Sequence, residues 1–127
     1  MPKQILITDH APAPIGPYSQ AVLANNQLFV SGQVAIDPAT NELIEGNITD
    51  ETHQVMKNLS AILQAAGLSF AHVVKCSIFV KDMNDFATIN AAYGHYFTEN
   101  PPARETVEVS CLPKNVNVEI SCIAITD

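Results

Sequence analysis

The sequence predicts a single α+β domain, residues 1–127, in which a mixed β-sheet carries two helices packed on one face. The chain has 127 residues, of which 47% are hydrophobic and 15% charged, so it has enough apolar side chains for one core. Two segments with helical periodicity stand among segments with strand-like alternation. Because two helices can cover only one face of a sheet, we expect the other face to be solvated or covered by further subunits.

Strands are expected on both sides of the helical segments. An apolar run at Ile5–Ile7 comes first, followed by Gln20–Ala24 and Leu28–Gln33, which Asn25-Asn26 joins. Asn tolerates left-handed backbone angles, so this pair predicts a tight hairpin turn. The remaining strands are expected at Val73–Val80, Arg104–Val109 and Asn117–Ile125, and a loop around Asp37-Pro38 and Asn41.

The clearest helix is predicted over Asp50–Ala66, where apolar residues recur at helical spacing. Thr49 or Asp50 can cap its start, and Gly67 stands where a left-handed residue commonly ends a helix. A second helix is predicted after Asn84 or Asp85. Its expected buried stripe is Phe86, Ile89, Asn90, Tyr93 and Phe97.

The charge balance excludes some classes of partner. The formal net charge is −7, and the five lysines are scattered along the chain, so we expect no nucleic-acid partner and no membrane partner. The low charged fraction and the mean hydropathy of +0.13 hint at a homo-oligomer that hides apolar surface.

The sequence also predicts a reduced, cytoplasmic protein. Cys76, Cys111 and Cys122 are odd in number and lack CxxC spacing, which suits a reducing compartment. No signal peptide and no apolar run of about 20 residues is visible. The four histidines lack metal-ligand spacing, and no phosphate-binding glycine loop occurs.

Arg104 is the chain's one arginine, and its planar fork of donors suits a carboxylate or a phosphate. The alternative is a surface arginine with a weak ion pair. If the last two strands pair as neighbours, Glu119 and either Arg104 or Thr106 would face one cleft, where Glu119 could act as a general base. Otherwise Glu119 faces solvent. Asn90 either knits the core or lines a site.

Several ordered motifs add to these residues. They are Ala13-Pro14-Ile15-Gly16-Pro17-Tyr18-Ser19-Gln20-Ala21, Phe29-Val30-Ser31-Gly32-Gln33, the segment 80–90, Pro102-Ala103-Arg104, Leu112-Pro113-Lys114 and Val118-Glu119-Ile120. From end to end, this pattern resembles the Rid/YjgF family, specifically its RidA branch.

The resemblance implies a fold similar to trimeric chorismate mutase and a homotrimer with active sites between subunits. It implies hydrolysis of 2-imino acids or their enamine tautomers, such as 2-iminobutanoate and 2-iminopropanoate, to 2-oxo acids and ammonia. No cofactor and no metal are implied for this activity.

The resemblance also assigns roles to residues. Arg104 matches the arginine that binds the substrate carboxylate, and Glu119 matches the acid that positions water. Residues that match the pocket lining are Tyr18, Ser31, Gly32 and Asn90. Thr106 stands where the family commonly has cysteine; its hydroxyl can still bind substrate or water, which leaves hydrolysis possible but not a covalent cysteine mechanism. Glu105 replaces a commonly small residue and should point away from Arg104.

Three other functions remain open at this point. A non-enzymatic trimer could use the same arginine to bind a small carboxylate metabolite and regulate a partner. Relatives described as translation inhibitors or ribonucleases suggest RNA as a substrate, against which the net charge of −7 argues. A chaperone-like protein would act independently of Arg104.

Overall fold

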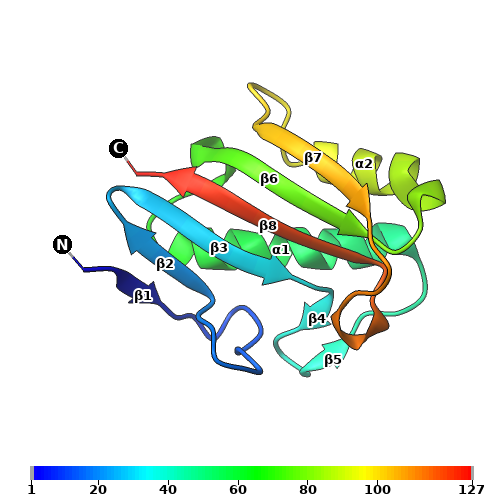
Figure 1. The fold of residues 1–127 in the computed structure, drawn as a ribbon, viewed down its shortest axis with the longest axis horizontal. Helices are drawn as coiled ribbons and strands as arrows, with labels where there is room; N and C mark the ends of the chain where they lie inside the picture. Colours follow the sequence, from blue (N-terminus) through cyan, green and yellow to red (C-terminus); the bar gives the residue numbers. More distant parts are fainter. Residues whose placement is uncertain (1, 127) are drawn as a thin grey trace.

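The computed structural model describes residues 2–126 and contains a six-stranded sheet with two helices behind it (Figure 1). The strand order is β1-β2-β3-β8-β6-β7, and every neighbouring pair is antiparallel except the parallel pair β6–β7. The elements are β1 (Gln4–Leu6), β2 (Ala21–Ala24), β3 (Gln27–Gln33), β4 (Ile36–Asp37), β5 (Glu42–Leu43), α1 (Ile48–Ala65), β6 (Val73–Val80), α2 (Phe86–Gly94), β7 (Ala103–Glu108) and β8 (Val118–Ile125). The predicted fold class is therefore confirmed.

The hairpin between β2 and β3 is the one that the sequence predicts. Asn25 and Asn26 have φ values of 50° and 63°, so both central residues of the turn are left-handed. This is the geometry whose twist matches that of the flanking strands. The short β4–β5 hairpin lies in the segment predicted as a loop, and its strands have only two residues each.

Helix α1 begins earlier than predicted. The side chain of Asn47 accepts a hydrogen bond from the backbone N–H of Asp50, so the cap is Asn47 and not Thr49 or Asp50. The predicted end is confirmed, since Gly67 has φ of +76°. Gly67 N–H donates to the Gln64 carbonyl and Leu68 N–H to the Leu63 carbonyl, which closes the helix with a Schellman motif.

Helix α2 begins at Phe86, directly after Asp85, whose side chain makes no capping hydrogen bond. Of its predicted buried stripe, Ile89 and Tyr93 are buried, whereas Asn90 is exposed. The prediction that Asn90 belongs to the buried stripe of this helix was therefore wrong. The helix lies behind the sheet at its β7 edge, next to α1 (Figure 1).

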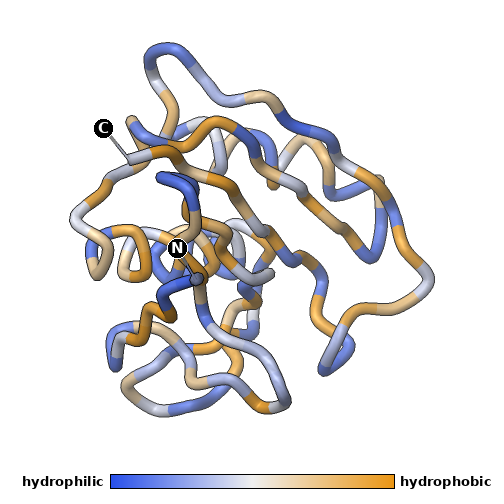
Figure 2. Tube along the Cα trace, turned by 60° about the vertical axis from the view of Figure 1, so that its left-hand side comes forward, coloured by the Kyte–Doolittle hydropathy of each residue, from blue (hydrophilic) through white to orange (hydrophobic). Residues whose placement is uncertain are grey.

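The two faces of the sheet differ in what covers them. The helix-covered face is formed by alternate, fully buried residues such as Ile78, Val80, Val118 and Ile120, and it packs against α1. The open face presents Phe29, Val107 and Ile125, which are 42%, 41% and 43% exposed. Figure 2 shows hydrophobic residues recurring along the strands, while the connecting turns are mostly hydrophilic.

Strands β7 and β8 are not neighbours, because β6 lies between them (Figure 1). The condition under which Glu119 and Arg104 would share one cleft is thus not met within a single chain. Among residues 2–126, no helix is both long and apolar enough to cross a membrane.

Candidate active site

Arg104 extends from the edge strand β7 toward α2. Its partner across the parallel ladder is Cys76, whose side chain is buried on the helix-covered face, so Arg104 lies on that face as well. Its Nη1 donates a hydrogen bond to Asn90 Oδ1 on α2. No carboxylate within residues 2–126 forms an ion pair with Arg104. The guanidinium charge is therefore available to an anionic ligand.

An open hollow lies beside this guanidinium, and we call it the arginine hollow. It is lined by Asn90, Tyr93, Phe97, Pro101, Pro102 and Arg104. Its walls are mostly aromatic rings and proline rings, with the guanidinium and one amide as polar groups. Such a surface suits a small ligand that has an anionic end and an apolar part.

Glu119 lies on the opposite face of the sheet, in a second, smaller hollow of about 80 Å³ that we call the glutamate hollow. Tyr18, Gly32, Pro113, Lys114 and Glu119 contribute to its lining. Glu119 is half-buried, and this burial raises the pKa of its carboxyl group. A carboxyl with a raised pKa can both accept and return a proton nearer to neutral pH.

Gly32 allows the Glu119 carboxylate to lie against the backbone of β3. A Cβ atom built on Gly32 would lie 2.5 Å from Glu119 Oε2 and 2.7 Å from its Cδ. These distances are far below van der Waals contact, so any larger residue at this position would displace the carboxylate. The structure therefore links Gly32 and Glu119, which the sequence places in separate motifs.

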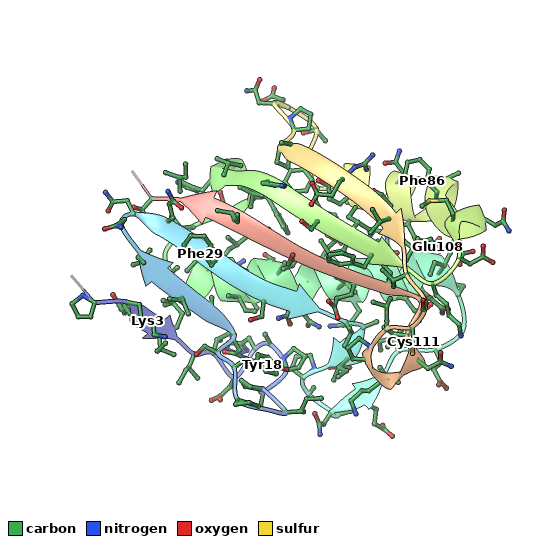
Figure 3. All side chains as sticks on the ribbon, in the orientation of Figure 1. Lys3, Tyr18, Phe29, Phe86, Glu108 and Cys111 are labelled. Atoms are coloured by element: carbon green, nitrogen blue, oxygen red, sulfur yellow. The ribbon has the colours of Figure 1, made fainter. Side chains whose placement is uncertain are left out.

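The loop before β2 carries Tyr18 to the edge of the glutamate hollow (Figure 3). Tyr18 is 49% exposed, and its hydroxyl accepts a hydrogen bond from Ile15 N–H at 3.4 Å. Gln20 is buried and bonds to the backbone of Thr8, Ala11 and Pro12, which fixes the path of this loop. Ser31 donates its hydroxyl hydrogen to the Ser19 carbonyl, 2.5 Å away. Ser31 thus joins the loop to β3.

The predicted site residues consequently form two groups. Tyr18, Gly32 and Glu119 line the glutamate hollow, and Ser31 joins the Tyr18 loop to the strand beside it. Arg104 and Asn90 lie together at the arginine hollow. The shared cleft was expected only if the last two strands pair as neighbours. That condition is not met in a single chain, because β6 lies between β7 and β8 and the two side chains point to opposite faces of the sheet.

Thr106 shares the helix-covered face with Arg104, and its Oγ1 atom is buried without a hydrogen-bond partner among the described residues. Glu105 points to the open face, as predicted. There it accepts a hydrogen bond from Ser77 and lies 3.2 Å from Lys75 Nζ. These two contacts lower the pKa of the Glu105 carboxyl.

The sequence analysis assigned no site role to four residues in or beside these hollows. Phe86 and Tyr93 contact the Arg104 guanidinium, Gln20 anchors the Tyr18 loop, and Lys114 lines the glutamate hollow with a left-handed φ of 57°. A signal was present for the first pair. Phe86, Asn90 and Tyr93 are spaced four and three residues apart, which places them on one face of a helix.

Other catalytic chemistries have little support at these positions. Burial raises the pKa of the Cys76 thiol, and it raises that of Cys122 to about 12, which disfavours the reactive thiolate form. Within residues 2–126, no group of three or more His, Cys, Asp or Glu side chains is arranged to hold a metal ion.

Comparison with known proteins places the chain in a family. The endoribonuclease L-PSP family model matches residues 8–126. A RutC family protein of Pyrococcus horikoshii is 54% identical over 122 residues, which cover 96% of this chain and 97% of that protein. Human 2-iminobutanoate/2-iminopropanoate deaminase is 43% identical over 123 residues, covering 97% of this chain and 90% of the human protein.

A solved structure agrees with these matches. The crystal structure of Escherichia coli TdcF with bound serine has a TM-score of 0.93 and 39% identity, and the match covers 98% of this chain and 99% of that one. The family model, the relatives and the solved structure all indicate the same family. The chain therefore belongs to the endoribonuclease L-PSP family, the family of the Rid and RutC proteins that its motifs resemble.

Proposed function

We propose that this protein is a hydrolytic deaminase of small 2-imino acids, such as 2-iminobutanoate and 2-iminopropanoate, which it converts to 2-oxo acids and ammonia. The observation that carries the proposal is the guanidinium of Arg104, which has no carboxylate partner within residues 2–126 and faces an open hollow with polar and apolar walls. The activity named for the human relative, at 43% identity, supports the same chemistry.

In this proposal Arg104 binds the substrate carboxylate and places the C=N bond near the carboxyl group of Glu119, which accepts and donates protons. An arginine can donate two parallel hydrogen bonds to a carboxylate, which fixes the direction of the ligand. Asn90 occupies only Nη1, so further N–H donors of the guanidinium remain for the substrate. The apolar lining beside Arg104 would accept the short alkyl group of the imino acid.

Glu119 would act on water. A protonated imine is already electrophilic, so a positioned water adds to its carbon while Glu119 accepts one of the water protons. Return of that proton to nitrogen makes an ammonium leaving group. The C–N bond then breaks and ammonia leaves. The remaining hydroxyl gives its proton to the Glu119 carboxylate and becomes the carbonyl of the 2-oxo acid. The raised pKa of Glu119 suits both proton transfers.

We further propose that the two hollows meet across an interface between copies of this chain in a homotrimer. Arg104 and Glu119 lie on opposite faces of one sheet, so a complete site needs the arginine hollow of one subunit beside the glutamate hollow of its neighbour. The open face, with exposed Phe29, Val107 and Ile125, offers apolar surface for such an association. Cofactors play no part in this proposal.

The decisive experiment follows release of ammonia and of 2-oxo acid from freshly generated 2-iminobutanoate and 2-iminopropanoate. Wild-type protein should accelerate release, and Arg104→Ala should lower kcat/KM by roughly 100-fold, because a charge-assisted pair to the carboxylate is lost. A wild-type rate equal to the uncatalysed rate would refute the deaminase. Tight binding of 2-oxobutanoate without turnover would then favour a carboxylate-binding regulator.

Oligomeric state is tested separately by light scattering coupled to size exclusion. A mass of three chains is expected, and a monomer at assay concentration would refute an intersubunit site. In the same preparation, RNA should neither bind at moderate salt nor be cleaved, as the net charge of −7 predicts.

A further inference from the structure

Helix α2 surrounds the guanidinium of Arg104 with three side chains. The Arg104 Cζ atom lies 5.6 Å from the centre of the Phe86 ring and 5.3 Å from the centre of the Tyr93 ring. Asn90, between them in sequence, accepts the hydrogen bond from Nη1. Spacings of four and three residues put all three on one face of the helix.

The two rings are anchored two turns apart, which is about 10 Å along a helix axis. The Cζ atom lies within 5.6 Å of both ring centres, so the guanidinium contacts both rings. A cation close to an aromatic ring is attracted by the negative face of the ring, and more strongly the further the cation is desolvated. With the amide contact, these interactions restrain both the position and the plane of the guanidinium.

The restraint matters because β7 is an edge strand and Arg104 is exposed. A free arginine side chain loses the freedom of several rotatable bonds when it binds a ligand. A guanidinium that is already ordered loses less on binding, so its affinity for a carboxylate rises.

Tyr93 is the most firmly placed of the three. It is 5% exposed, its hydroxyl lies near the Cys76 thiol, and its ring packs against Phe97 with 4.9 Å between ring centres. Among the described residues the hydroxyl has no hydrogen-bond partner, so it contributes little to holding the ring. The ring itself is therefore the part that acts on Arg104.

We propose that Phe86 and Tyr93 are positioning residues that pre-order the Arg104 guanidinium for a carboxylate ligand. This inference rests on the proposed role of Arg104 in substrate binding. It adds the prediction that removing either ring weakens carboxylate binding, whereas removing only the Tyr93 hydroxyl does not.

Because Arg104 is the chain's one arginine, its side-chain Nε–H gives a single, unambiguous NMR signal in ¹⁵N-arginine-labelled protein. In the free wild type we expect this signal to be displaced by the ring currents of Phe86 and Tyr93 and to show restricted motion. Phe86→Leu and Tyr93→Leu should each move it toward the position of a free arginine and increase its mobility. Tyr93→Phe should leave it nearly unchanged.

The second readout is the Kd for 2-oxobutanoate, a stable carboxylate. Each leucine variant should bind roughly tenfold more weakly, while Tyr93→Phe binds as the wild type does. Phe70→Leu is the matched control, since Phe70 belongs to the same aromatic cluster, with 5.2 Å between its ring centre and that of Phe97, but has no contact with Arg104. It should change neither the Arg104 signal nor the affinity.

The inference is overturned if both leucine variants keep the wild-type signal and affinity, or if Phe70→Leu alters them equally. If Tyr93→Leu does not fold, Phe86→Leu alone provides the test, because Phe86 is only half-buried. The proposed deaminase fails differently. In that case the wild-type protein shows no turnover, or its Arg104 NMR signal does not change when 2-oxobutanoate is added. The effect of Phe86→Leu and Tyr93→Leu on the Arg104 signal of the free protein still tests the positioning role.

Discussion

Arg104 and Glu119 lie on strands separated by β6 and point to opposite faces of the same sheet. Arg104 is aligned with Cys76 on the helix-covered face, and Glu119 is aligned with Phe79 on the open face. A single chain therefore cannot bring these two groups into one cleft. Under the proposed function they meet in an assembly in which each subunit completes its neighbour's site; the alternative is that the two hollows serve independent functions.

Mixed oligomers distinguish these two possibilities. Arg104→Ala and Glu119→Gln should each be nearly inactive alone, because each removes one half of every site. In mixed trimers made by co-expression with two affinity tags, one interface joins an intact Arg104 to an intact Glu119, so about a third of wild-type activity should return. Activity that stays at the level of the single variants would contradict an intersubunit site.

Replacement of Gly32 tests the contact between β3 and Glu119. Gly32→Ala places a Cβ atom 2.5 Å from the present position of Glu119 Oε2, so the carboxylate must move. We expect kcat to fall roughly 10–100-fold, the range in which general acid–base catalysis begins to be lost. The Kd for 2-oxobutanoate should change little, since Arg104 is untouched. An unchanged kcat would mean that the placement of Glu119 is unimportant.

Local features of the fold were predictable from the sequence. The bounds Val73–Val80 agree with those of β6, and Asn25-Asn26 forms the expected left-handed turn. Both depend on side chains within a few residues of one another, namely β-branched residues in a strand and paired asparagines in a turn. Gly67 is a similar case, because its left-handed angle is a local property of the helix end.

Which residues meet across the sheet could not be predicted in the same way. The parallel pairing of β6 with β7 connects residues that are distant in sequence, such as Cys76 and Arg104, and no local pattern specifies it. The exposure of Asn90 also depends on where α2 lies relative to the sheet edge. Hydrophobic periodicity shows which side of a helix is apolar, but not how much of that side a neighbouring element covers.

The start of α1 offers a direct test between the predicted and the observed cap. Asn47→Ala removes the acceptor for Asp50 N–H, so the free energy of unfolding should fall by about 1 kcal/mol. Thr49→Ala, at the residue first expected to cap the helix, should change it by less than about 0.5 kcal/mol, because Thr49 is exposed. Urea unfolding at one fixed protein concentration measures both. Equal losses for the two variants would contradict the observed cap.

Glu51 makes a further prediction about pH and stability, independent of the proposed activity. Its side chain is 7% exposed, and burial raises the pKa of its carboxyl above the ordinary value of 4.5, against the opposing hydrogen bond from Asn117. A folded chain that holds this proton more tightly than the unfolded chain loses stability as pH rises from about 4.5 through the raised pKa. Below that window both states are protonated and the effect vanishes.

Glu51→Gln should therefore raise the free energy of unfolding at pH 7, because the buried charge disappears. In the wild type, Asn117 Nδ2 donates to Glu51 Oε2 at 2.7 Å, and the amide oxygen of the glutamine can still accept this hydrogen bond. The gain should shrink to nothing as the pH falls below 4.5. Glu42→Gln, which removes the same charge from an exposed position, controls for net charge and should show no comparable gain. Urea unfolding from pH 4 to 8 measures the difference, and a gain that persisted unchanged at pH 4 would show that packing, and not ionisation, is responsible.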